Sequence, residues 1–297
     1  MNMIRHHALL ITALALIGGS AAPLAQDSPE SAPVPEPAPD SEPAPVPEPA
    51  PVPEPSALID YATVEGVTLR AHVFEAKTGE PPHPAILFFF GGGWTGGSPQ
   101  QFYPFAEPLA ELGFVAIPME YRVRGRHDST IPDSMADAFA AFRWAHDNAD
   151  ELGIDPARIV VSGGSAGGHL AATVGTIAEH SGFGPSAMVL YNPVTDLGDV
   201  NNINRLNDLI AGDAAAVSPL EHIEAGAPRT IIFHGEDDAT VPIAQSEAFC
   251  AAMTAVGNQC MLSRFAGEGH GFFNARLAAF EPVLMQTISF LRPELEE

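Results

Sequence analysis

A serine in a glycine-rich turn is the first residue whose setting suggests chemistry. The turn Gly163–Gly168 joins a predicted strand, 158–162, to a predicted helix that begins at 167, and Ser165 stands within it. Glycines at both ends let strand and helix approach closely, and the sharp turn projects the serine hydroxyl from the sheet edge. Glycine turns also bind phosphate, but that use calls for a second contact, often a lysine, and none is nearby. The pattern therefore predicts Ser165 as a nucleophile.

A serine hydroxyl needs an adjacent base, and a histidine far along the chain has suitable surroundings. His270 lies between two glycines, in a loop that follows predicted strand 261–265 and precedes the last predicted helix. Two other histidines compete with it. His234 ends an earlier strand and is interpreted as a loop-organising residue, whereas His169 is expected to pack along the helix after the serine. We therefore predict His270 as the base.

An acid must orient the base, and three aspartates at strand ends are candidates. Asp238 lies in the loop that leaves predicted strand 230–233, and Asp237 precedes it directly. Asp196, at an earlier strand end, is a weaker candidate. The acid accepts the imidazole N–H, fixes the tautomer and stabilises the imidazolium. We expect Asp238 to have this role, with Asp237 as an alternative that one sequence barely separates from it.

A tetrahedral intermediate needs preorganised backbone donors for its oxyanion. One donor should be the N–H of Ala166, directly after the serine, and the others should come from the glycine loop Gly91–Trp94, which follows predicted strand 85–90. Trp94 and Phe272, with Phe273 beside it, are candidates for lining the substrate pocket. Each of these aromatic residues could equally belong to the core.

The predicted strands and helices must bring these residues together at one edge of a sheet. Segments 58–64 and 67–74 alternate apolar and polar residues around Glu65-Gly66 and predict an antiparallel hairpin. Further short apolar runs predict strands at 85–90, 114–119, 158–162, 187–191, 230–233 and 261–265. Helical patterns lie between and after them, at 101–112, 132–151, 167–180, 243–256 and 277–291. This alternation predicts an α/β fold with a mostly parallel eight-stranded sheet and helices on both faces.

Taken together, the serine turn, the glycine loop and the Asp238 and His270 loops resemble the α/β-hydrolase fold. More narrowly, they resemble hormone-sensitive-lipase-like and feruloyl/acetyl-xylan-esterase-like carboxylesterases, over about residues 59–291. The resemblance implies that Gly92, Gly93 and Ala166 donate to the oxyanion. Two departures from the family pattern stand out, since Phe90 replaces the usual histidine before the glycines and Gly164 occupies a position that is often acidic.

The resemblance implies a serine carboxylesterase, with acetyl or carbohydrate esters as expected substrates if the protein is exported. Short-chain acyl esters are expected because the segment that could form a cap is brief. Segment 198–223 is too brief for a large cap and is expected to form a short partial lid. No metal or organic cofactor is expected, because the chain has no metal-binding spacing such as H-E-x-x-H. Two alternatives stay open: a serine peptidase of the prolyl-oligopeptidase type, and a catalytically silent binding protein on the same fold.

Composition narrows the range of partners. The formal net charge is −24, and only 13 residues are lysine or arginine. A nucleic-acid partner normally demands a basic surface, and anionic lipid headgroups would be repelled as well. The expected partner is a small-molecule or polysaccharide-linked ester, and the sequence leaves the oligomeric state open.

The first residues predict export. Residues 1–25 combine a basic start, an apolar run and small residues, which is typical of a signal peptide. The apolar run has only about ten residues, whereas a bilayer-spanning anchor, the alternative, needs roughly 20. Residues 26–56 form a Pro/Glu-rich linker, and 57–297 are the expected catalytic domain. The predicted location is periplasmic or secreted, where Cys250 and Cys260 could form a disulfide rather than remain two buried thiols.

Overall fold

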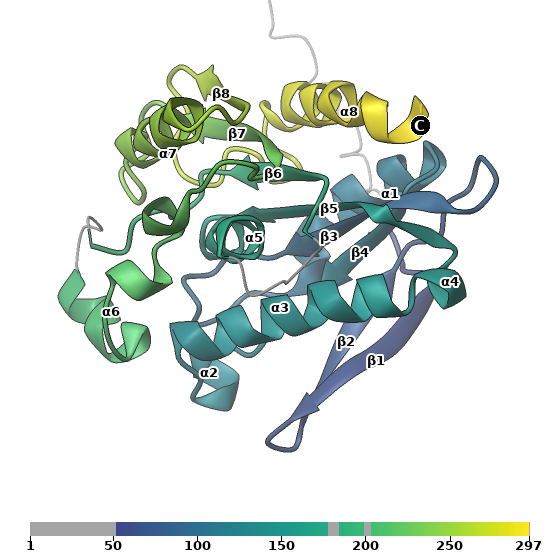
Figure 1. Cartoon of the computed structure of the whole chain (residues 1–297), viewed down its shortest axis with the longest axis horizontal. Coiled ribbons are helices and arrows are strands. Elements are labelled where there is room, and N and C mark those ends of the chain that lie inside the picture. Colours follow the sequence, from purple (N-terminus) through teal and green to yellow (C-terminus); the bar gives the residue numbers. More distant parts are fainter. Residues whose placement is uncertain (1–51, 178–183, 199–202, 297) are drawn as a thin grey trace, which may run out of the picture. The chain divides into compact units, whose positions relative to one another are not determined.

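The core of the molecule is an eight-stranded sheet. The computed structural model describes residues 52–177, 184–198 and 203–296 (Figure 1). The strand order is β1-β2-β4-β3-β5-β6-β7-β8, in which β1–β2 and β2–β4 are antiparallel and all other pairs are parallel. The strands are β1 Ala57–Val64, β2 Val67–Val73, β3 His83–Phe89, β4 Val115–Met119, β5 Ile154–Gly164, β6 Ala187–Tyr191, β7 Arg229–Gly235 and β8 Cys260–Phe265. The predicted fold class is confirmed.

Burial along the strands explains the sequence patterns. β1 and β2 alternate between more and less exposed residues, whereas β4 and β6 are buried at every position. A strand covered by helices on both faces can be apolar throughout, and a half-covered hairpin alternates. The β1–β2 turn uses Glu65 and Gly66 at positive φ, which matches the twist of a two-residue hairpin.

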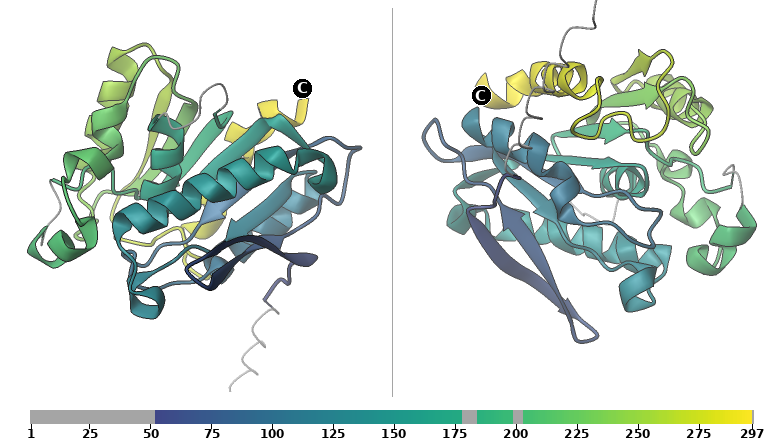
Figure 2. Two further views of the ribbon diagram at one scale, coloured as in Figure 1. Left: turned by 60° about the horizontal axis from the view of Figure 1, so that its bottom comes forward. Right: turned by 180° about the vertical axis from the view of Figure 1, so that it is seen from behind.

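Helices cover both faces of the sheet. α3 and α5 pack against each other on one face, whereas α1 and α8 lie on the other, where Phe105 of α1 meets Phe280 of α8 (Figures 1 and 2). The helices are α1 Tyr103–Glu111, α2 Arg124–His127, α3 Ile131–Asp147, α4 Ala149–Leu152, α5 Ala166–Thr176, α6 Ile203–Ile210, α7 Ala244–Ala255 and α8 Phe280–Glu296. A short 3₁₀ helix, Pro99–Phe102, precedes α1.

Three helices differ from their predicted spans. The single helix expected over 132–151 is divided at Asn148, which leaves helical geometry and donates its side-chain amide to the carbonyl of Trp144. The helix expected over 277–291 begins only at Phe280, after turns that place Arg276 at positive φ, and continues through Pro293. The helix expected over 167–180 ends at Thr176, because Ile177 is extended, and residues 178–180 lie outside the described residues.

Parallel pairing brings the carboxyl ends of five strands into line. Phe89 at the end of β3 pairs with Gly163 of β5, Gly164 pairs with Tyr191 of β6, and Tyr191 pairs with Phe233 of β7. Gly235 at the end of β7 pairs with Phe265 at the end of β8. The loops that follow these ends are the ones in which the sequence places its chemistry.

The N-terminal predictions fall mostly outside the structure. The expected signal peptide and residues 26–51 of the expected linker are outside the described residues. Ser56 is bound to the sheet, because its N–H donates to the carbonyl of Val73 at 2.7 Å. In the described ranges, no helix combines the length and the apolar character that a membrane crossing requires.

Candidate active site

The turn after β5 holds Ser165 in a strained conformation. Its φ is 55° and its ψ is −119°, an unusual combination for a residue with a side chain. Space explains the neighbouring glycines: a Cβ at Gly163 would meet the carbonyl of Gly167, and a Cβ at Gly167 would meet the carbonyl of Phe89. The strand and α5 therefore close on each other beneath Ser165, as the sequence predicts.

Gly164 is explained by an aromatic ring rather than by backbone. A Cβ at this position would run into the ring of Phe273, which also stacks on Tyr191 and Phe102. Phe273 thus occupies the space beside the serine turn that a side chain at 164 would need.

His270 lies beside the serine hydroxyl. Its Nε2 is 3.0 Å from Oγ of Ser165, across 105 residues of sequence. The side chain of His270 is 26% exposed, so the pair is open to a small molecule from solvent. The histidine loop comes directly after β8 and its turn, at the same sheet edge as Ser165.

Asp238 contacts the other ring nitrogen of His270. Nδ1 of His270 is 2.8 Å from Oδ2 of Asp238, and the amides of Thr240 and Val241 donate to Oδ1, each at 2.9 Å. The carboxylate is fully buried, whereas Asp237 is exposed. Asp196 instead accepts the amide of Gly198. Of the three candidate acids, the structure brings only Asp238 to His270.

The surroundings of Asp238 keep it ionised. Burial alone would raise the pKa of this carboxyl, but hydrogen bonds from His234, His270 and the amide of Val241 outweigh it and hold the pKa well below its usual range. His234 also contacts Oγ of Ser246 and the carbonyl of Val241. It therefore organises the acid loop, as predicted.

The glycine loop lies against the serine turn. A Cβ built on Gly91 would come within 3.4 Å of the Ser165 Cβ. Gly92 uses its carbonyl to accept the amides of Thr95 and Gly96, which closes the loop. Among the described hydrogen bonds, none uses the amides of Gly92 and Gly93. Ala166 is the first residue of α5, so its amide has no acceptor within the helix. These amides remain available to a ligand oxygen.

Trp94 and Phe272, the candidate pocket residues, are buried. Phe272 is 2% exposed and packs on Phe265 and Phe273, so the structure favours the core alternative for it. Trp94 is 3% exposed and meets the ring of His169 edge-on. His169 packs within the protein as expected. Burial lowers the pKa of its ring to about 4, although a hydrogen bond to the carbonyl of Val217 opposes this.

Three amide side chains near the site were not singled out from the sequence. Gln101 connects the glycine loop to Asn274, which follows His270 in the chain, and Asn192 at the end of β6 contacts Gly271. Asparagine and glutamine carry no spacing signature of their own. Only their position after strand ends could have indicated them.

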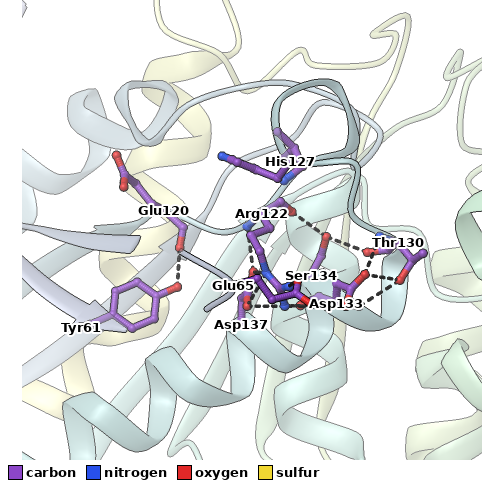
Figure 3. A network of polar contacts seen from close by, with 10 residues as sticks. Tyr61, Glu65, Glu120, Arg122, His127, Thr130, Asp133, Ser134 and Asp137 are labelled. Atoms are coloured by element: carbon purple, nitrogen blue, oxygen red, sulfur yellow. Dashed lines mark hydrogen bonds and ion pairs between the residues drawn. The ribbon is translucent and has the colours of Figure 1, made fainter. Parts of the chain in front are cut away.

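The basic cluster at 122–127 is mainly structural. Arg122 is buried and forms paired hydrogen bonds with the buried carboxylate of Asp137 in α3, and it also reaches Glu65 and Asp133 (Figure 3). Arg124 and Arg126 donate to the carbonyls of Asp208 and Gly97. Arg122 therefore forms its ion pairs within the protein.

The geometry allows nucleophilic chemistry at Ser165. A histidine positioned by a buried carboxylate can remove the serine proton, and free amides beside it can hold an oxyanion. Within the part of the chain that the structure covers, no three His, Cys, Asp or Glu side chains gather as a metal site would require.

Comparisons with solved structures show close overall similarity. The apo form of Thermogutta terrifontis esterase 2 is 39% identical, with a TM-score of 0.76, and the match covers 84% of this chain and 97% of that one. The propionate-bound form of the same thermophilic esterase is 40% identical, with a TM-score of 0.73, and the match covers 80% of this chain and 93% of that one.

Curated relatives and a family model agree with the structural match. Esterase LipQ of Mycobacterium tuberculosis is 30% identical over 197 residues, which are 59% of this chain and 46% of LipQ. Esterase LipC of the same organism is 30% identical over 217 residues, which are 64% of this chain and 53% of LipC. The chain thus spans about half the length of these curated relatives. A model of a family with the alpha/beta hydrolase fold matches residues 86–274, more than half of the chain, and the chain therefore belongs to the α/β-hydrolase fold family.

Proposed function

We propose that this chain is a serine carboxylesterase in which Ser165, His270 and Asp238 form the catalytic triad. The observation that carries the proposal is the unbroken contact from Ser165 Oγ through the His270 ring to the buried Asp238 carboxylate. The esterases among its relatives and structural neighbours support the same activity.

The proposed reaction has two acyl-transfer steps. Ser165 Oγ attacks the ester carbonyl while His270 Nε2 takes the hydroxyl proton, and the amides of Gly92, Gly93 and Ala166 bind the oxyanion. The bond to the alcohol breaks as His270 returns the proton to the leaving oxygen. Water then attacks the acyl-enzyme, His270 accepts its proton, and the bond to Ser165 breaks as the serine is reprotonated. Asp238 stabilises the imidazolium in both steps.

Short acyl groups are the proposed substrates. Two structural neighbours, both forms of the Thermogutta terrifontis esterase, have propionate and butyrate bound. The segment between β6 and β7 holds only α6 and two short 3₁₀ helices among its described residues, which agrees with the brief lid expected from the sequence. The natural substrates that we propose are acetyl or other short esters on carbohydrates. An exported enzyme would meet such esters outside the cytoplasm.

The test is hydrolysis of p-nitrophenyl esters from acetate to laurate, with acetylated xylan and a prolyl peptide anilide in parallel. Fast cleavage of the acetate and butyrate esters, with none of the anilide, is expected. Preferential cleavage of the anilide would establish a peptidase instead. No turnover of any ester, together with no labelling of Ser165 by paraoxon, would establish a silent binding protein. A Ser165→Ala variant with full esterase activity would refute the triad.

Export is a separate part of the proposal and is supported by residues 1–25 alone. Expression of the full chain in a bacterium with a periplasm is expected to yield a mature protein in the periplasmic or secreted fraction. Its N-terminal sequence should begin between about residues 22 and 26. An intact N-terminus in the cytoplasmic fraction would contradict export.

A further inference from the structure

Two carboxamide side chains connect the glycine loop to the histidine loop. Oε1 of Gln101 accepts the amide of Gly91 at 2.6 Å, and its Nε2 donates to Oδ1 of Asn274 at 2.9 Å. Gln101 lies in the 3₁₀ helix after the glycine loop, 173 positions before Asn274. A single side chain thus spans the two loops that the proposed reaction uses from different ends of the sequence.

Asn274 carries the connection to the residue that follows the base. Its Nδ2 donates to the carbonyl of Gly271 at 2.7 Å, and its backbone amide donates to the same carbonyl at 3.0 Å. From the other side, the amide of Gly271 donates to Oδ1 of Asn192 at 3.4 Å. The peptide groups on both sides of Gly271 are therefore held, and His270 is the residue directly before it.

The donors and acceptors in this bridge can be arranged in only one way. The amide of Gly91 can only donate, so the oxygen of Gln101 must face it and the nitrogen must face Asn274. The oxygen of Asn274 must then accept, which leaves its nitrogen for the carbonyl of Gly271. A carboxylate at position 101 could still accept from Gly91 but could not donate to Asn274. The bridge therefore requires an amide, and not merely a polar side chain, at position 101.

We propose that Gln101 is a positioning residue for ester hydrolysis, which holds the oxyanion-binding loop in register with the Ser165–His270 pair. The proposal rests on the proposed function. Oxyanion donors act only within about 2.7–3.1 Å of the developing charge, so a small displacement of the glycine loop lowers turnover. Substrate binding through the acyl chain does not depend on that register. Loss of the bridge is therefore expected to lower kcat and to leave KM nearly unchanged.

The matched pair of variants is Gln101→Ala and Gln100→Ala. Gln100 lies in the same 3₁₀ helix but is exposed, and its side-chain oxygen contacts only the hydroxyl of Ser98 among the described hydrogen bonds. On p-nitrophenyl butyrate, Gln101→Ala should lower kcat about ten- to hundredfold with KM within threefold of wild type. Gln101→Glu should fall similarly, and Gln100→Ala should stay within twofold. Affinity for a boronic acid, which mimics the tetrahedral intermediate, should fall in parallel with kcat.

A double-mutant cycle separates positioning from a general loss of structure. The double variant Gln101→Ala, Asn274→Ala should lose less kcat than the product of the two single losses. Both single variants break the same bridge, so their effects are not independent. A kcat of Gln101→Ala within twofold of wild type, or a loss confined to KM, would overturn the proposal. Failure of the proposed function would look different: Ser165→Ala would remain active, or paraoxon would not label Ser165 in the wild type.

Discussion

At the scale of single residues, burial in one loop distinguishes the proposed triad acid from its neighbour. Asp237 and Asp238 differ by one position, and in a turn this difference sends one side chain to solvent and the other onto His270. The sequence predicts the loop and the residue type. It cannot predict the direction of each side chain, because that depends on amides of the same loop closing around Oδ1.

Asp238→Asn should lower kcat about a thousandfold or more, as loss of a triad acid does elsewhere. The asparagine oxygen can still accept the amides of Thr240 and Val241, so the loop is retained. Its NH₂ would face Nδ1 of His270 and favour the wrong tautomer. The control is Asp237→Asn, which should keep kcat within twofold. Equal losses in the two variants, measured on p-nitrophenyl butyrate, would contradict the assignment.

The buried ring of His169 predicts a dependence of stability on pH. Its pKa is about 4 in the folded protein and about 6.5 when unfolded, so between these values the unfolded chain binds more protons. Stability should therefore decrease as pH falls from 6.5 to 4, by up to about 3 kcal/mol from this ring. Urea unfolding at pH 7, 5.5 and 4.5 should show a steeper decrease for wild type than for His169→Gln. Parallel curves would refute this contribution.

At the scale of elements, the sequence predicts those strands and helices whose positions depend on local residue patterns. The eight strands lie where alternation (β1 and β2) or apolar runs (the other six) predict them, and α3 begins at Ile131 through a capping box of Thr130 and Asp133. The errors lie where one side chain redirects the backbone, as at Asn148. The Gln101–Asn274 bridge could not be predicted from any periodicity. It depends on how the segments that follow β3 and β8 meet in space, although β5, β6 and β7 separate the two strands in the sheet.

The ion pair of Arg122 ties the loop after β4 to α3 and the β1–β2 turn (Figure 3). Burial raises the pKa of Asp137 despite the hydrogen bonds from Arg122, so this carboxylate depends on its partner. Arg122→Met should lower the free energy of unfolding by about 3 kcal/mol, because it leaves a buried charge unpaired.

The control for that prediction is an exposed pair. Arg70 lies 3.9 Å from Asp60, with side chains 48% and 69% exposed, and such pairs contribute little. Arg70→Met should therefore change the free energy of unfolding by less than about 0.5 kcal/mol. Denaturant titration of both variants measures the difference. Similar losses would mean that burial does not govern the Arg122 pair.

At the scale of the whole catalytic unit, the parallel sheet converts distant sequence positions into one site. Ser165, Asp238 and His270 follow β5, β7 and β8, and the glycine loop follows β3. Since neighbouring parallel strands end at the same edge, their order in the sheet fixes which loops meet. The fold class and the loops that meet could be predicted from the sequence for this reason. Acyl specificity could not, because it depends on which side chains surround the bound acyl group.

The disulfide between Cys250 and Cys260 ties α7 to β8, the last strand in the sheet order. Closing a loop of this length stabilises a protein by about 3 kcal/mol in the chain-entropy model. Dithiothreitol should therefore lower the Tm of wild type by about 5–10 °C. A Cys250→Ser, Cys260→Ser variant should melt at the lower temperature with or without reductant. An unchanged Tm for reduced wild type would mean that pairing with β7 and contacts with α7 are enough to hold β8. An oxidising compartment would then add nothing to the stability of this fold.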